Sequence, residues 1–287
     1  MKEFNYIEAF SCNLGWVTEQ ELQQLRCQKV AIAGMGSVGG DHLINLTRLG
    51  ISRFHISDMD AFKMVNFNRQ TGASMSTIGQ LKVFKLEDTA KDINPELEIK
   101  TFPEGINETN LEDFLDSVDL YVDSIDIFAV HIRRKIFDYC FRNYIPIISA
   151  ASLGMGTSVI CFNKSRIHPD EYFGWKDNQT LEEQVLRFLV GMSPLPNQLK
   201  YLVDPEKANL FKRKAPSTPM GIHLAAGTLG AIALKVLLGR GKVIEAPRTM
   251  HFDAYLNTYK VIWRPFGAKN PLQKITLRYV RKRLLGN

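Results

Sequence analysis

The sequence has few cysteines, and their spacing suits neither a metal nor a set of disulfides. The four Cys, at positions 12, 27, 140 and 161, include no CxxC pair, which excludes a disulfide framework and a paired-Cys zinc site. No apolar run approaches the roughly 20 residues of a membrane-spanning helix. The first residues include Glu3, Asn5 and Glu8, where a secretory signal would be apolar. We therefore expect a cytoplasmic protein with reduced thiols.

The remaining composition is that of a globular protein. The chain has 287 residues, of which 45% are apolar and 23% charged, and this excludes disordered, collagenous and coiled-coil classes. The length allows one large domain or two modest ones. The 36 basic and 30 acidic residues give a net charge of +6, which permits an anionic partner without requiring one.

Apolar runs alternate with helical patterns through the first half of the chain. Bounded apolar or alternating runs predict strands at 29–33, 53–58, 97–102, 119–123 and 146–150. Helical spacing predicts helices at 37–49, 78–93 and 130–143. This alternation favours an α/β, Rossmann-like fold with a mostly parallel sheet and helices on both faces.

After one more predicted strand at 156–162, the second half departs from that rhythm. Residues 163–217 contain five Pro and few strand signals, as expected of a lid or substrate-binding segment. Its aromatic residues, which include Tyr172, Phe173, Trp175 and Phe188, suit a groove for an extended peptide C-terminus and a small core under the loop equally. A helix at 219–238 and a strand hairpin at 249–253 and 258–263 follow, which predicts a C-terminal antiparallel extension. The basic tail, 269–287, shows no large apolar face, so it predicts a solvated end, a dimer arm or an anion-binding helix, and no membrane contact.

A glycine-rich motif directly follows the first predicted strand and opens a helix. In Gly34-Met-Gly36-Ser-Val-Gly39, the first glycine allows a tight turn, the second lets a phosphate approach the backbone, and the third permits close helix packing. An acidic residue about 20 positions later should bind a ribose. Asp58 and Asp60 both satisfy that spacing. The motif therefore predicts nucleotide binding.

Charged residues beyond the motif suit a nucleoside triphosphate. Arg69 and Lys82 offer a planar fork and a compact charge for phosphate oxygens. Asp126 follows the fourth predicted strand, at the sheet edge where a carboxylate can hold Mg²⁺. Each has an ordinary alternative: Arg69 as a loop ion pair, Lys82 as a surface lysine and Asp126 as a helix N-cap.

The strings GxGxxG, SDMDAFKMVNFNRQ, IGQLKV, INPE and VDSID, in this order, resemble the ThiF/MoeB/E1-like adenylyltransferase family. The resemblance covers roughly residues 29–163 and resumes at 216–238 and 251–255. It implies a homodimeric enzyme that binds ATP and Mg²⁺ and converts a substrate carboxylate to an acyl-adenylate.

The resemblance also implies roles for single residues. Asp60 holds the ribose, Arg69 and Lys82 hold the phosphates, Asn66 helps to orient them, and Asp126 binds Mg²⁺. The remaining predicted nucleotide contacts are Asp58, Gln70 and the three motif glycines, Gly34, Gly36 and Gly39.

The sequence departs from this family at three points. Cys12 stands where relatives often carry an Arg that reaches the partner subunit's ATP. Paired CxxC motifs are absent, so no zinc is expected. The segment 163–217 contains no Cys, while Cys140 and Cys161 fall within a predicted helix and strand, so we expect no thioester on this chain.

These observations predict an N-terminal arm (1–28), one nucleotide-binding domain (29–268) with a crossover or substrate segment at 163–217, and a basic tail (269–287). The predicted function is ATP-dependent adenylation of a carboxylate, for example the C-terminus of a ubiquitin-like or sulfur-carrier protein. The alternatives are a tRNA threonylcarbamoyladenosine dehydratase-like enzyme, an NAD-dependent oxidoreductase and an inactive binding scaffold. RNA is a permitted but less favoured partner.

Overall fold

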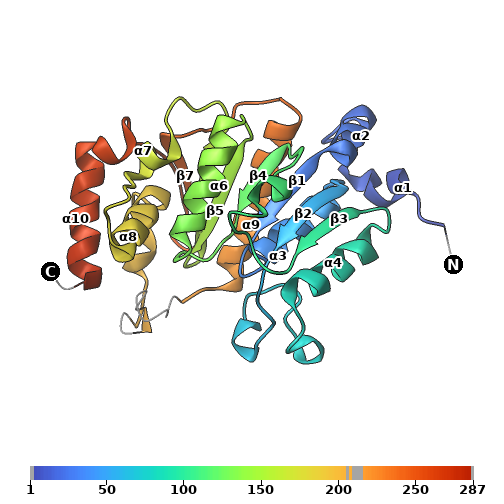
Figure 1. Ribbon diagram of the computed structural model, residues 1–287, viewed down its shortest axis with the longest axis horizontal. Coiled ribbons are helices and arrows are strands. Elements are labelled where there is room, and N and C mark those ends of the chain that lie inside the picture. The colour runs from blue at the N-terminus through green and yellow to red at the C-terminus, as the bar shows by residue number, and fades with distance from the viewer. Residues whose placement is uncertain (1–2, 205–206, 209–215, 286–287) are drawn as a thin grey trace. The chain divides into compact units, whose positions relative to one another are not determined.

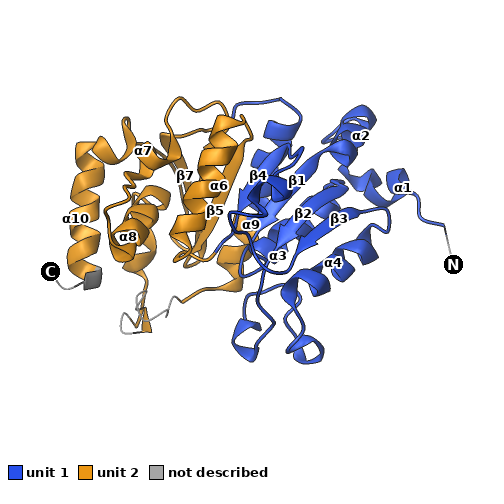
Figure 2. Ribbon diagram, viewed as in Figure 1, with its two compact units in different colours: residues 1–125, 226–243 blue, residues 126–225, 244–287 orange. Residues whose placement is uncertain are grey.

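The structure is a computed structural model that describes residues 3–204, 207–208 and 216–285. The chain divides into two compact units, which Figure 2 colours separately. The first is Met1–Ile125 with Ala226–Val243, and the second is Asp126–Ala225 with Ile244–Asn287. Compactness alone does not set the number of domains, so the single nucleotide-binding domain over 29–268 stays a prediction.

The first unit contains parallel strands whose carboxyl ends are in register (Figure 1). These strands, in the spatial order β3-β2-β1-β4, are β1 (Lys29–Ala33), β2 (Arg53–Ser57), β3 (Glu98–Phe102) and β4 (Leu120–Asp123). Ala33 pairs with both Ser57 and Asp123, and Ser57 pairs with Phe102. The segments that follow these strands therefore leave the sheet at one edge, the edge at which open α/β sheets bind ligands.

The helices of the first unit follow the apolar spacing of the sequence. They are α1 (Tyr6–Phe10), α2 (Glu19–Cys27), α3 (Gly39–Arg48), α4 (Lys82–Ile93) and α5 (Leu111–Phe114). The spacing within α3 buries Leu43 and Leu46 completely. Beyond α3 the chain turns at Gly50, whose φ of 103° is one that residues with a Cβ rarely adopt.

The predicted N-terminal arm packs into the first unit. The Tyr6 hydroxyl donates a hydrogen bond to the Gly50 carbonyl oxygen at 2.5 Å, and burial raises the pKa of Tyr6 to about 12. The Arg26 guanidinium lies 4.5 Å from the centre of the Tyr6 ring, and Phe10 is buried beside it. The described part of this segment thus belongs to the core rather than extending from it.

The second unit contains antiparallel strands. In the order β5-β6-β7-β8, they are β5 (Ile147–Leu153), β6 (Gly156–Phe162), β7 (Arg248–Asp253) and β8 (Thr258–Trp263). A tight turn joins β5 to β6 through Gly154, at a φ of 60°, and another joins β7 to β8. The predicted α/β fold, with parallel strands and a C-terminal antiparallel extension, is confirmed.

The crossover segment forms helices over an aromatic core. The helices of the second unit include α6 (Val130–Arg142), α7 (Pro169–Phe173), α8 (Leu181–Met192) and α10 (Pro271–Leu285). Four aromatic side chains of the segment are almost completely buried: Tyr172, Phe173, Trp175 and Phe188. Phe173 stacks on Trp175 with ring centres 4.4 Å apart. These rings therefore fill a core instead of lining a substrate groove. Residues 205–206 and 209–215 of the segment lie outside the described residues.

Helix α9 (Pro219–Leu237) begins in the second unit and continues into the first. Within the described ranges it is the one helix long and apolar enough to cross a membrane, and half of it is buried in protein. The expectation that no apolar run approaches about 20 residues does not hold for α9, although His223, Thr228 and Lys235 interrupt its apolar residues. A buried core helix of a soluble protein has the same length and composition, so α9 is weak evidence for a membrane span.

Helix α3 carries a histidine that should make folding sensitive to acid. His42 is completely buried, and neither ring nitrogen has a partner among the described residues. Burial lowers its pKa from 6.5 to about 3. Between those values the unfolded chain binds a proton that the folded chain does not, so this group's contribution to stability falls as pH decreases from about 6.5 toward 3.

Replacing His42 with Met should remove this pH-dependent contribution to the free energy of unfolding. Going from about pH 7.5 to about pH 4.5, the wild type should lose roughly 2–3 kcal/mol more unfolding free energy than His42→Met, at about 1.4 kcal/mol per pH unit. Urea unfolding at both pH values measures the difference. His131→Gln, at an exposed position, is the matched control. Equal losses in all three proteins would show that His42 is not held neutral.

Candidate active site

The glycine loop lies at the sheet edge where the parallel strands end. Gly34 follows β1 at a φ of 89°, and a Cβ at this position would lie 2.3 Å from the Ser124 carbonyl oxygen. A Cβ at Gly39 would lie 1.8 Å from the Gly34 carbonyl oxygen. At Gly36, in contrast, a Cβ would meet nothing within 4 Å. The first and third glycines therefore allow close packing of the chain, while the second presents its backbone to open space, as phosphate binding requires.

Asp58 supports the loop from the end of β2. Its Oδ2 accepts a hydrogen bond from the Met35 backbone N–H at 2.7 Å, and its Oδ1 accepts one from the Asp60 N–H at 2.7 Å. Burial raises the pKa of this carboxyl, and the nearby Lys82 opposes the shift. Since backbone groups engage both oxygens, Asp58 fits a structural role. Asp60 is then the better candidate for the ribose.

Asp60 and Lys82 form an ion pair in this region. The Lys82 Nζ lies 3.0 Å from the Asp60 Oδ2, with 6% of the lysine side chain and 62% of the aspartate side chain exposed. The Lys82 backbone N–H also donates to the Asp60 carbonyl oxygen at 2.9 Å, at the start of α4. The lysine is therefore not the freely solvated surface residue of the ordinary alternative. Its fixed cation fits an anionic ligand.

Arg69 is attached to the glycine loop. Its Nε donates to the Ser37 Oγ at 3.1 Å, and its Nη1 donates to the Val65 carbonyl oxygen at 2.9 Å. The guanidinium is thus held beside the segment that should bind phosphates, with a backbone and a hydroxyl partner in place of a loop carboxylate. The sequence predicted Arg69 without its partner Ser37, which occupies a variable position of the motif.

The neighbouring amides differ in their surroundings. Asn66 is buried, and its Oδ1 accepts a hydrogen bond from the Lys63 N–H at 2.8 Å, which closes the turn before Arg69. Gln70 is also buried, and its Oε1 has no partner among the described residues. Asn66 therefore shapes the loop, whereas Gln70 retains an unused acceptor. Its role toward the nucleotide stays a prediction.

Ser124 is a polar residue of this edge that sequence reasoning missed. It follows β4, and its buried Oγ has no partner within the part of the chain that the structure describes. A Cβ placed on Gly39 would lie 3.2 Å from the Ser124 Cβ. Its signal in the sequence is its position directly after a buried strand, in the string Asp123-Ser124, which also carries the more strongly polar carboxylates.

Asp126, the predicted Mg²⁺ ligand, begins the second unit. Its Oδ1 accepts a hydrogen bond from the Phe128 N–H at 2.8 Å, and its carbonyl oxygen accepts from the Arg133 Nη1 at 3.2 Å. The carboxylate is exposed. Mg²⁺ in nucleotide sites commonly uses one or two carboxylates together with phosphates and water, so Asp126 fits that ion. No group of three or more His, Cys, Asp or Glu gathers within the described residues.

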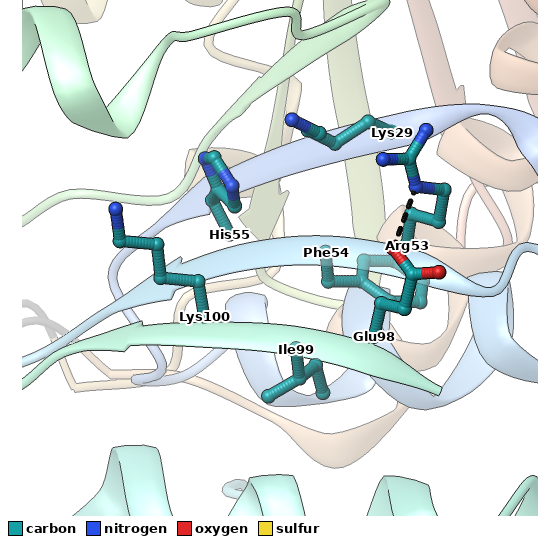
Figure 3. Close-up of a pocket in the computed structure, with 7 residues that line it drawn as sticks. All are labelled: Lys29, Arg53, Phe54, His55, Glu98, Ile99 and Lys100. Atoms are coloured by element: carbon teal, nitrogen blue, oxygen red, sulfur yellow. Dashed lines mark hydrogen bonds and ion pairs between the residues drawn. The ribbon is translucent and has the colours of Figure 1, made fainter. Parts of the chain in front are cut away.

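A shallow cavity of about 210 Å³ lies elsewhere on the first unit (Figure 3). It is lined by Lys29, Arg53, Phe54, His55, Glu98, Ile99 and Lys100. Lys29, Arg53 and Glu98 are the first residues of their strands, so the cavity lies toward the amino ends, away from the glycine loop. Arg53 pairs with Glu98 at 3.0 Å, and Lys100 pairs with Asp113 at 2.5 Å. Paired, exposed charges of this kind do not define an active site.

The parallel strands and the glycine loop after β1 are typical of α/β proteins that bind nucleotides. The ThiF family profile matches residues 10–274, so the chain belongs to the ThiF family. The family resemblance read from the motifs is confirmed.

Two curated relatives and one solved structure illustrate the family. The tRNA threonylcarbamoyladenosine dehydratase of Haemophilus influenzae is 32% identical over 52% of this chain and 57% of the relative. The molybdopterin-synthase adenylyltransferase of Escherichia coli is 27% identical over 59% of this chain and 70% of the relative. The structure of E. coli MccB with ATP has a TM-score of 0.65 at 17% identity, covering 88% of this chain and 69% of MccB, and it shows a shared fold.

The chain covers only part of the relatives that it matches first. It spans 57% and 65% of the lengths of the dehydratases from Haemophilus influenzae and Bacillus subtilis. The activity, substrate and partner of this chain are therefore proposals.

Proposed function

We propose that this chain uses ATP to adenylate a carboxylate. The observation that carries the proposal is the attachment of Arg69 to Ser37 of the glycine loop, which fixes a cation beside the predicted phosphate site. Lys82 supplies a second cation, held by Asp60. An NAD-dependent oxidoreductase, the competing interpretation of the glycine motif, has less need of two fixed cations for a diphosphate.

The proposed reaction is displacement at phosphorus. A carboxylate oxygen of the substrate attacks the α-phosphorus of ATP, the bond to the bridging oxygen breaks, and pyrophosphate leaves with the bonding electrons. Because the substrate carboxylate is itself the nucleophile, the protein supplies positioning and positive charge. When bound, Mg²⁺ would neutralise charge on the pyrophosphate, and Asp126 would hold it. Arg69 and Lys82 would orient the phosphates, and Asp60 the ribose.

We further propose that the acyl group does not pass to a cysteine of this chain. Cys140 and Cys161 are fully buried, and burial raises the pKa of the Cys161 thiol far above its usual value. Cys12 and Cys27 are exposed and free, but both belong to the N-terminal segment that precedes β1. The product of this chain would then be a bound acyl-adenylate. We also propose that the protein is a cytoplasmic homodimer, as the family resemblance implies.

Two classes of carboxylate are the candidates. A carrier protein or peptide C-terminus fits the exposed outer face of the β7–β8 hairpin, where Tyr259 and Trp263 are each 57% exposed. A threonylcarbamoyl-modified tRNA is favoured by the similarity of this chain to two tRNA threonylcarbamoyladenosine dehydratases. The first is our principal proposal, since it rests on a surface of this protein.

Exchange of labelled pyrophosphate into ATP tests the function directly. We expect exchange that depends on a carboxylate, with carrier-protein C-terminal peptides and threonylcarbamoylated tRNA as separate trials. Cys140→Ser and Cys161→Ser should exchange at the wild-type rate, because neither thiol is needed before adenylate formation. Absence of exchange with every carboxylate, together with thermal stabilisation by NAD and not by ATP, would favour the oxidoreductase. Absence of exchange and of stabilisation by either nucleotide would favour the inactive scaffold.

A further inference from the structure

The positive charge of the chain is concentrated at its C-terminal end. Residues 244–287 contain nine Lys and Arg against two acidic residues, Glu245 and Asp253. The formal charge of this segment, +7, therefore exceeds the +6 of the whole chain. The predicted nucleotide site does not account for this charge, since Arg69 and Lys82 lie outside the segment.

Helix α10 carries much of this charge and is fixed to the second unit along one side (Figure 1). The Gln273 Nε2 donates to the Val190 carbonyl oxygen at 2.9 Å, and the Arg281 Nη2 pairs with the Glu183 Oε2 at 2.5 Å. Both partners belong to α8. The sequence left this segment as a basic tail, whereas the structure makes it a docked helix with a defined exposed side.

A row of cations follows the exposed side of α10. Lys274, Arg278 and Lys282 are exposed and spaced four residues apart, so they form one row with about 6 Å of axial rise per step. None of them is ion-paired with a carboxylate in the described structure. Like charges at this spacing destabilise a helix. The row is therefore suited to a ligand that brings many negative charges close together.

An apolar row lies beside the cations. Leu272, Ile275 and Tyr279 are 56%, 59% and 51% exposed, and helical geometry places them between the cation row and Arg283. The Arg283 Nη1 also donates to the Tyr279 hydroxyl at 3.0 Å. An apolar strip with cations on both sides is the arrangement of helices that lie in the interface of an anionic membrane.

We propose that the exposed side of α10 binds the surface of a bilayer that contains anionic lipid. Cations would contact the lipid phosphates while Leu272 and Ile275 enter the acyl boundary. An RNA could use the cations and stack a base on Tyr279, but it would gain nothing from the exposed aliphatic side chains of Leu272 and Ile275, which cannot stack on bases. The sequence predicted no membrane contact because it did not reveal which apolar residues face solvent, and the structure supplies that observation.

Co-sedimentation of the full-length protein with vesicles tests this proposal. The protein should bind vesicles of phosphatidylcholine mixed with phosphatidylglycerol, bind pure phosphatidylcholine far more weakly, and dissociate as salt rises. Each cation near an anionic surface strengthens binding roughly fivefold, so Lys274→Gln/Arg278→Gln/Lys282→Gln should weaken binding on the order of 100-fold. Leu272→Ser/Ile275→Ser should weaken it by roughly tenfold or more, because apolar burial is lost.

A charge-matched control separates this surface from net charge alone. Lys164→Gln/Lys176→Gln/Lys242→Gln removes the same charge from exposed positions and should retain binding. All variants should keep the wild-type thermal midpoint and pyrophosphate exchange, which makes failure of this proposal distinguishable from failure of the proposed function. Vesicle binding that survives loss of the cation row would overturn the proposal. The proposal would also be overturned if the protein bound polyuridylate more tightly than vesicles and Leu272→Ser/Ile275→Ser left that affinity unchanged. A dimer that dissociates on this double substitution would overturn it as well.

Discussion

Arg69→Met is expected to slow carboxylate-dependent pyrophosphate exchange by about 10²- to 10³-fold, the usual loss when one fixed donor to developing charge is removed. The guanidinium is held by Ser37 and by the Val65 carbonyl oxygen, so its position is set before any ligand binds. Arg69→Lys should recover only part of the rate, because an ammonium cannot reproduce the planar fork. Steady-state exchange rates at saturating ATP measure both effects.

The same prediction requires a control for general electrostatics and folding. Arg53→Met removes a cation from the same unit, at the amino end of β2, where its partner is Glu98. Exchange should be unchanged in that variant, since exposed ion pairs of this kind contribute little. Urea unfolding of Arg69→Met should show a loss of no more than about 3 kcal/mol, as expected when hydrogen bonds donated by a charged guanidinium are lost. Wild-type exchange in a fully folded Arg69→Met would remove Arg69 from the mechanism.

The position of the site could be predicted from the sequence because its signals are local. Short buried strands end at Gly34, Asp58 and Ser124, and parallel strands in register must deliver these positions to one edge. The assignment of roles to Asp58 and Asp60 could not be predicted, because both satisfy the spacing. The two roles separate only in the structure, where Asp58 accepts from two backbone N–H groups while the carboxylate of Asp60 pairs with Lys82 and is largely exposed.

Long-range packing accounts for the other differences. The composition of 172–188 suits a groove or a core equally. In the structure its aromatic side chains are buried among α6, α7 and β6 and therefore form a core. In α10, apolar and basic residues alternate without a clear stripe. Contacts with Val190 and Glu183, some 80 to 100 positions earlier in the chain, determine which side is exposed.

The two glycines at positions 36 and 39 should respond to alanine in opposite ways. Gly39→Ala places a methyl group 1.8 Å from the Gly34 carbonyl oxygen and 2.8 Å from its carbonyl carbon, and these backbone atoms cannot move aside easily. We expect a loss of about 3 kcal/mol or more in unfolding free energy, at the upper end of overpacking effects. Gly36→Ala meets nothing within 4 Å and should leave stability within about 1 kcal/mol of wild type.

ATP affinity should be lost in Gly36→Ala, the variant that keeps its stability. If phosphates approach the backbone at Gly36, the added methyl group occupies their space, and ATP affinity should fall at least tenfold although the protein remains stable. Gly227→Ala is the matched control, since a Cβ there also meets nothing within 4 Å and the residue lies within α9. Calorimetric titration with ATP and urea unfolding on the same samples separate the two effects. Wild-type ATP affinity in Gly36→Ala would mean that the open side of the loop is not where the phosphates bind.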